Sequence, residues 1–104
     1  MIDLHCHSHF SDGALSPELL FQKASAAGLR VLALTDHDTT DGLLPLQCAA
    51  KNSDITIING IELSARWKKH DIHILGLQIR PSDPNLKALI IRQNESRIAR
   101  AKEI

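Results

Sequence analysis

The hydrophobic pattern of this chain consists of short aliphatic runs separated by longer mixed segments. Residues 1–4, 31–34 and 56–58 are brief, β-favouring runs of the kind that buried parallel strands show. A helical pattern fills the segment between the first two runs. The pattern therefore predicts an α/β fold that begins with a β–α–β unit over roughly residues 1–35.

Two further strands are expected after this unit. The third spans about residues 55–63, and an extension to Trp67 stays open. Polar residues 68–71 then indicate a turn into a fourth strand over residues 72–79, where apolar positions recur.

The first helix has clear start and stop signals. Ser16 is a suitable N-cap, Pro17 fits the first helical position, and Glu18 suits the positive end of the helix dipole. Gly28 provides the stop. The apolar stripe of this helix consists of Leu19, Leu20 and Ala24.

Two more helices are predicted. One lies within residues 40–51, where Pro45 requires that the helix begin near Leu44 or that its first turn be irregular. The last is capped by Ser82 or Asp83 and continues to the end of the sequence without a stop signal. Its apolar stripe comprises Leu86, Leu89, Ile90, Ile98 and Ala101.

The composition is that of one small folded domain. The 104 residues allow a single core, and an apolar share of 43% argues against disorder. Cys6 and Cys48 form no CxxC pair, which argues against a disulfide scaffold or a zinc ribbon. No signal-peptide pattern and no apolar segment near the ~20 residues of a membrane span occur, so a cytoplasmic location is predicted.

Charge is distributed unevenly although the net charge is zero. Residues 1–64 hold three basic and eight acidic side chains, and residues 65–104 hold nine basic and four acidic ones. An acidic half that is rich in histidine suits a cation site, and a basic half suits an anionic substrate. Two differently solvated faces would give the same imbalance.

A pair of alternating histidines provides the first candidate for metal binding. His5 and His7 follow the first strand, and alternate residues of an extended segment share a face, so both imidazoles can reach one divalent ion. Cys6 points to the opposite face and is expected to pack rather than coordinate. Cys48 is expected on the core face of its helix.

The following strands each add a side chain of the ligand type. His37 follows the second strand, Glu62 lies on the third and His73 on the fourth. Sites assemble at the carboxyl edge of open α/β sheets and barrels, and an unpaired buried histidine or glutamate is costly. We therefore predict a shared metal site.

Other polar residues have less certain assignments from the pattern alone. Asp12 provides a carboxylate from the first loop, although aspartate before glycine is also an ordinary turn residue. His9 could contact a metal ion or a substrate, or support the ligands. Three aspartates could orient the ligand imidazoles from behind: Asp3, Asp36 and Asp38. Asp38 and Asp41 could equally cap the second helix. His70, in the predicted turn, is expected to be solvated.

These residues resemble the motifs of the PHP (polymerase and histidinol phosphatase) superfamily. Residues 3–8 with Ser11-Asp12-Gly13 are similar to its first motif, and residues 34–38 to its second. Residues 60–62 and 73–76 are similar to the elements that follow. The likeness is greatest to the stand-alone branch, which contains the ribonuclease AM and 3′,5′-nucleoside bisphosphate phosphatase enzymes.

The resemblance implies a distorted (β/α)7 barrel with up to three metal ions, usually manganese, with zinc or iron as alternatives. By that similarity His5 and His7 bind one ion, and Glu62 bridges it to a second that His73 also holds. Asp12 and His37 bind the third. Because the family's later ligands are absent, the chain is expected to be an N-terminal portion truncated after about four strands. Residues 1–79 would then belong to the metal-binding domain, and residues 80–104 would form a helix leading toward an inserted domain.

The implied activity is metal-dependent hydrolysis of nucleotide 3′-phosphates, including 3′,5′-bisphosphates, or of short RNA from its 5′ end, by the intact enzyme. The chain by itself is expected to be inactive and to associate through exposed sheet edges. Alternatives are a non-catalytic metal-binding fragment, or a phosphatase for another small phosphate ester. Nucleic-acid binding by the basic segment 87–102 is disfavoured because no aromatic residue is interspersed among its charges.

Overall fold

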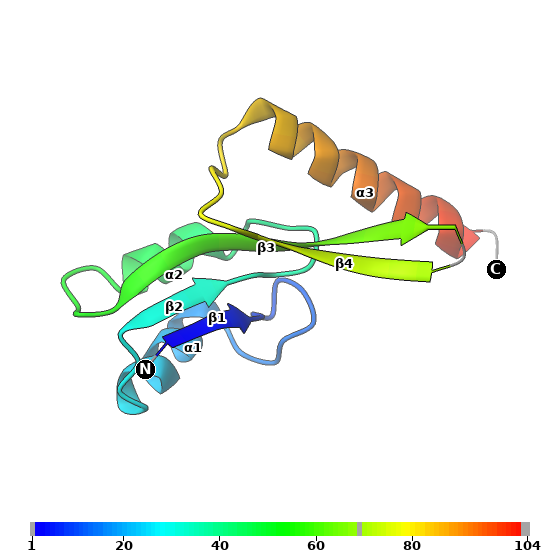
Figure 1. Cartoon of the computed structure of the whole chain (residues 1–104). Helices are drawn as coiled ribbons and strands as arrows, with labels where there is room; N and C mark the ends of the chain where they lie inside the picture. Colours follow the sequence, from blue (N-terminus) through cyan, green and yellow to red (C-terminus); the bar gives the residue numbers. More distant parts are fainter. Residues whose placement is uncertain (1, 69, 103–104) are drawn as a thin grey trace.

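The computed structural model describes residues 2–68 and 70–102. It contains four strands and three helices, arranged as Figure 1 shows. In chain order they are β1 (Ile2–Cys6), α1 (Pro17–Ala26), β2 (Val31–Leu34), α2 (Leu43–Ala49), β3 (Thr56–Trp67), β4 (His70–Leu77) and α3 (Pro84–Lys102). The α/β class and the initial β–α–β unit are confirmed.

The four strands form one sheet in the order β1-β2-β3-β4. The pairs β1–β2 and β2–β3 are parallel, whereas β3 and β4 form an antiparallel hairpin. The first residues of β3 pair with β2, and the residues from Gly60 onward pair with β4 instead. The long β3 therefore joins the parallel part of the sheet to a projecting hairpin (Figure 1).

The core lies between the parallel strands and the first two helices. Its buried members are Ala24, Leu32, Leu34, Leu43 and Leu46, with Leu20 and Phe21 packed against them. Such burial stabilises the fold by about 25 cal/mol for each Å² of apolar surface removed from water. The remaining helix, α3, extends beside the β3–β4 hairpin (Figure 1).

The helix boundaries agree with their predicted signals. The Ser16 hydroxyl accepts a hydrogen bond from the Leu19 N–H at 3.2 Å, and Gly28 adopts φ +77° just after α1. Pro45 lies in the first turn of α2, where backbone N–H groups have no partner within the helix, so the proline sacrifices no hydrogen bond. Of the two alternatives that Pro45 left open, the structure shows the first: the helix begins near Leu44.

The cap of α3 is Asp83 rather than Ser82. The Asp83 carboxylate accepts the Asn85 N–H at 2.8 Å, and its carbonyl accepts the Lys87 N–H at 3.0 Å. Leu86, Leu89 and Ile90 are half-buried, as the predicted stripe requires. The side chains of Ile98 and Ala101 and the predicted end of the helix at Ile104 lie outside the described residues.

Several boundary and burial predictions were wrong. His70 is the first residue of β4 rather than part of a turn, although it is exposed as expected, and β4 ends at Leu77 rather than Ile79. Cys48 is exposed because it lies on the solvent side of α2, and Leu19 is 48% exposed for the same reason on α1. In the part of the chain that the structure describes, no helix combines the length and the apolarity needed to cross a membrane.

Candidate metal centre

The strands bring the predicted ligands to one edge of the sheet. His5 lies at the end of β1 and His7 just beyond it, while His37 follows β2. The backbone places His37 beside Glu62 of β3, because the Glu62 N–H donates to the Asp36 carbonyl and the Asp38 N–H donates to the Glu62 carbonyl, both at 3.0 Å. In the β3–β4 register, His73 pairs with Ser64, two residues beyond Glu62 and on the same face.

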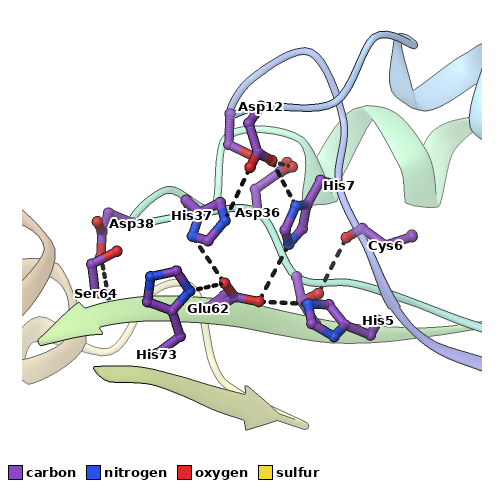
Figure 2. A network of polar contacts seen from close by, with 12 residues as sticks. His5, Cys6, His7, Asp12, Asp36, His37, Asp38, Glu62, Ser64 and His73 are labelled. Atoms are coloured by element: carbon purple, nitrogen blue, oxygen red, sulfur yellow. Dashed lines mark hydrogen bonds and ion pairs between the residues drawn. The ribbon is translucent and has the colours of Figure 1, made fainter. Parts of the chain in front are cut away.

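The Glu62 carboxylate is the point on which four imidazoles converge (Figure 2). His5 Nε2 lies 2.5 Å and His7 Nε2 3.4 Å from Oε1. His37 Nδ1 lies 3.0 Å and His73 Nδ1 2.8 Å from Oε2. The carboxylate is buried, with 4% of the residue exposed, so its surroundings are almost entirely these rings and the adjacent backbone.

Asp12 closes the cluster from the loop after β1. Its Oδ1 lies 2.6 Å from His7 Nδ1, and its Oδ2 lies 3.2 Å from His37 Nε2. His7 and His37 therefore each face both carboxylates, one through each ring nitrogen (Figure 2). The His7 and His37 ring centroids are only 4.5 Å apart.

The imidazoles favour the ionised form of both carboxylates. Burial would raise the pKa of Glu62, but the hydrogen bond from His5 and the charges of His37 and His7 lower it below its usual value. The pKa of the exposed Asp12 carboxyl is also lowered. Desolvation would raise this pKa, but the charges of His7 and His37 outweigh that effect. Both groups are ionised at neutral pH, which is the form that binds a cation.

The donor set fits divalent metal ions. Three overlapping groups each place their ligand atoms within 4.8 Å of one another; they are His5–His7–Glu62, His7–Asp12–His37 and His37–Glu62–His73. His7 Nε2 is buried and makes no hydrogen bond within the described residues, although Glu62 Oε1 lies 3.4 Å away, so this nitrogen is available to a metal ion. Four imidazoles around one carboxylate also exceed what ion pairing alone requires. Nitrogen and oxygen donors without thiolate suit manganese, zinc or iron.

A buried aspartate fixes the loop that carries His7 and Asp12. Asp36 accepts hydrogen bonds from the Ser8 N–H at 2.5 Å, the Ser8 hydroxyl at 2.6 Å and the Ser11 hydroxyl at 2.8 Å. Ser8 is fully buried and Asp36 is 2% exposed. At Gly13 a Cβ atom would lie only 2.2 Å from the His7 carbonyl oxygen, so only glycine allows this close approach.

Asp38 joins the site to more distant segments. Its carboxylate accepts the Ser64 N–H of β3 at 3.0 Å, and its carbonyl accepts the Asn94 side-chain amide of α3 at 3.3 Å. Asp38 has φ +54°, a left-handed conformation that the contacts on both sides maintain. The suggested helix-capping role of Asp38 was wrong, because Gly42 precedes the first residue of α2.

The remaining candidates lie around the cluster. His9 is exposed and its ring packs edge-on against Phe10, with centroids 4.6 Å apart. Asp3 accepts the His5 N–H at 3.0 Å and so supports the backbone before the first ligand. The Cys6 thiol donates to the Ala33 carbonyl at 3.2 Å, and burial together with Asp3 and Asp36 raises its pKa to about 12. Cys6 thus packs away from the cluster, as predicted.

Sequence reasoning missed the residues that hold the cluster in place. Ser8 and Ser11 bind Asp36, and Asn94 reaches Asp38 from α3. The two serines precede and follow the exposed pair His9-Phe10, a spacing that indicates a tight loop but not its acceptor. Asn94 carried no signal, since its partner lies 56 residues away.

Comparison with known proteins now identifies the class. The PHP domain family matches residues 3–100, and the chain belongs to this family. The match extends across residue 79, and the predicted division of the chain at that point stays a prediction.

Two curated relatives show the similarity. The chain is 45% identical over 103 residues to the 3′,5′-nucleoside bisphosphate phosphatase of Chromobacterium violaceum, covering 99% of the chain and 36% of that protein. It is 47% identical over 102 residues to a 5′-3′ exoribonuclease of Haemophilus influenzae, covering 98% of the chain and 37% of that protein. The chain therefore spans a little over a third of the length of these relatives.

Solved structures share the fold over nearly the whole chain. An amidohydrolase from Chromobacterium violaceum, solved with bound sulfate and no metal, has a TM-score of 0.90 at 45% identity, over 98% of the chain and 36% of that structure. A protein from Bifidobacterium adolescentis, described as a metal-dependent phosphoesterase, has a TM-score of 0.88 at 32% identity, over 97% of the chain and 35% of that structure. The prediction that the chain forms part of a PHP barrel with about four strands is confirmed.

Proposed function

We propose that this chain supplies most of the metal centre of a divalent-metal-dependent phosphoesterase. The observation that carries the proposal is the convergence of four imidazoles and two carboxylates into three overlapping groups of ligand atoms. Relatives with this family's fold are named a phosphatase, an exoribonuclease and a metal-dependent phosphoesterase. Hydrolysis of a phosphate ester is the activity common to those names.

Six side chains would hold the ions: His5, His7, Asp12, His37, Glu62 and His73. Glu62 belongs to two of the three groups and would bridge two ions. His7 and His37 each orient one ring nitrogen toward Glu62 and the other toward Asp12. Bound ions would supply Lewis-acid activation of a water and neutralise charge on the phosphoryl oxygens. The ionised Glu62 and Asp12 keep the centre anionic enough to retain such ions.

The ligand grouping differs from the family-based expectation in one respect. That expectation gave His5 and His7 to one ion, Glu62 and His73 to a second, and Asp12 and His37 to a third. Here His7 also joins the group of Asp12, and His37 also joins that of His73. Since a neutral imidazole offers one lone pair, we propose that His7 and His37 would each bind one ion and direct the other ring nitrogen, as N–H, toward a carboxylate. Manganese is the metal we propose, with zinc and iron as alternatives from the same donor set.

The proposed substrates are nucleotide 3′-phosphates, including 3′,5′-bisphosphates, and short RNA degraded from its 5′ end. The support comes from the names of the Chromobacterium and Haemophilus relatives. In the Chromobacterium structure the bound ion is sulfate, a tetrahedral oxyanion like phosphate.

The test is phosphate release from adenosine 3′,5′-bisphosphate by a protein of the relatives' full length that contains this chain, with manganese present. His37→Ala and Glu62→Ala should each reduce the rate at least a hundredfold, because each side chain serves two groups of ligands. His70→Ala is the matched control, since this exposed histidine of β4 belongs to none of the three groups among the described residues. Full activity of both cluster variants would refute the proposal.

A further inference from the structure

A cavity of about 440 Å³ opens beside the metal centre. Asp12, His37 and His73 contribute to its wall, so a phosphoryl group held at the cluster would lie at the edge of this cavity. The volume is within the range of ~300–1,000 Å³ that small-molecule sites occupy. The part of the ester that is not being hydrolysed has this space to enter.

The rest of the cavity wall has a distinct chemistry. It contains the Phe10 ring, the hydroxyls of Thr39 and Ser64, and the amide of Asn94. Among the described residues that line it, none is lysine or arginine, and the nearby Asp38 carboxylate adds negative charge. This wall suits an uncharged group with a flat apolar face and several hydrogen-bonding atoms.

Phe10 is held in place although it is exposed. Phe10 has 43% of its surface accessible, and its backbone N–H donates to the hydroxyl of the buried Ser8 at 3.2 Å. The neighbouring His9 N–H donates to the Leu15 carbonyl at 2.7 Å, and the His9 ring stands perpendicular to the Phe10 ring. A solvent-facing aromatic ring at a cavity wall, carried on an anchored backbone, is what base stacking uses.

We propose that Phe10 and the polar side chains that share its cavity form a subsite for the nucleoside part of the substrate. The inference rests on the proposed function and deepens it. In this arrangement the base stacks on the Phe10 ring, and the hydroxyl and amide groups of Thr39, Ser64 and Asn94 bind the ribose or the edge of the base. The cavity thereby favours nucleotides over phosphate esters that lack a base.

The experiment measures equilibrium binding of two probes, adenosine and inorganic phosphate, to the manganese-loaded, full-length protein. Phe10→Leu should weaken adenosine binding about tenfold, because it removes the stacking surface but keeps apolar volume. Phe10→Trp should retain adenosine binding, and inorganic phosphate binding should be the same in all variants. Phe21→Leu is the matched control, since this ring packs against the core and should not affect adenosine.

Three outcomes would overturn the subsite: no adenosine binding by the unaltered protein, adenosine binding that Phe10→Leu leaves unchanged, or equal weakening of adenosine and phosphate. The hydrolysis assay is separate. If adenosine binding depends on Phe10 but no phosphate ester is hydrolysed, the subsite stands and the proposed function fails. If base-free and nucleoside esters are hydrolysed with the same KM in both Phe10 forms, the function stands and the subsite fails.

Discussion

Replacement of Asp36 tests whether the cluster depends on a buried aspartate whose carboxylate holds the loop that carries His7 and Asp12. Its carboxylate accepts three hydrogen bonds, at 2.5, 2.6 and 2.8 Å, and two of the donors belong to the fully buried Ser8. Asp36→Ala leaves these donors without an acceptor. At ~1–3 kcal/mol for each unsatisfied buried group, we expect a loss of about 3–5 kcal/mol in the free energy of unfolding.

Asp36→Asn should be milder. The amide keeps one acceptor oxygen, and the Ser8 hydroxyl can turn to accept from the new NH₂ group. The remaining bonds lose their charge assistance, so the expected loss is about 1–2 kcal/mol. Metal affinity should nevertheless fall ~10–100-fold, as it does when groups that orient metal ligands are removed, because the loop carries His7 and Asp12.

Denaturant unfolding of the metal-free protein and a manganese titration measure the two effects. Asp41→Asn is the matched control, since this exposed aspartate makes the same change of charge five residues away and should stay within ~0.5 kcal/mol of the parent. The reasoning is refuted if Asp36→Ala costs no more stability than the control, or if Asp36→Asn binds manganese as tightly as the parent.

Three other predictions concern the loop after β1, the two cysteines and the exposed face of β4. Gly13→Ala should weaken manganese binding more than Ala14→Gly, because only the former forces a Cβ against the His7 carbonyl; equal effects in a metal titration would count against this account of the loop. Iodoacetamide should modify Cys48 quickly and Cys6 slowly in the native protein, since Cys48 is exposed whereas the Cys6 thiol is part-buried and donates to Ala33; mass spectrometry of a time course would show the reverse order if the packing is wrong. The 104-residue chain expressed alone should associate through β4, where Ile72, Ile74, Leu75 and Leu77 are 39–53% exposed; sedimentation should show dimers or larger species, and Ile74→Lys should reduce them, whereas a monomer at all concentrations would contradict the prediction.

Local signals predicted the parts of the fold that depend on short-range chemistry. Ser16, Pro17 and Gly28 bound α1 as expected, because a cap, a fixed φ and a positive φ act within a few residues. The placement of His5 and His37 beside each other also followed from strand order, because the parallel strands β1 and β2 present their carboxyl ends together. His73 lies on the antiparallel β4 and reaches Glu62 through the register of the β3–β4 hairpin, which strand order alone did not predict.

The features that sequence reasoning missed depend on long-range geometry. The pairing of β1 with β2 has a register irregularity between Asp3 and Cys6 that the alternating pattern did not indicate, although His5 and His7 lie together as predicted, with ring centroids 5.1 Å apart. Asp36 was expected to orient an imidazole, but its carboxylate lies beside Ser8 and Ser11 instead, which only the fold of the loop decides. Cys48 was misplaced because a short helix around Pro45 gives too few turns to define a buried face.

We propose that side chains from four successive strands, and from the loops that follow them, share divalent ions. Anomalous diffraction from crystals of the zinc- or manganese-loaded protein tests it most directly. We predict metal peaks within the three groups of ligand atoms, at about 2.0–2.2 Å from the imidazole nitrogens and carboxylate oxygens in the zinc form. Fully loaded crystals with metal bound elsewhere, and with Glu62 still paired only to imidazoles, would contradict it.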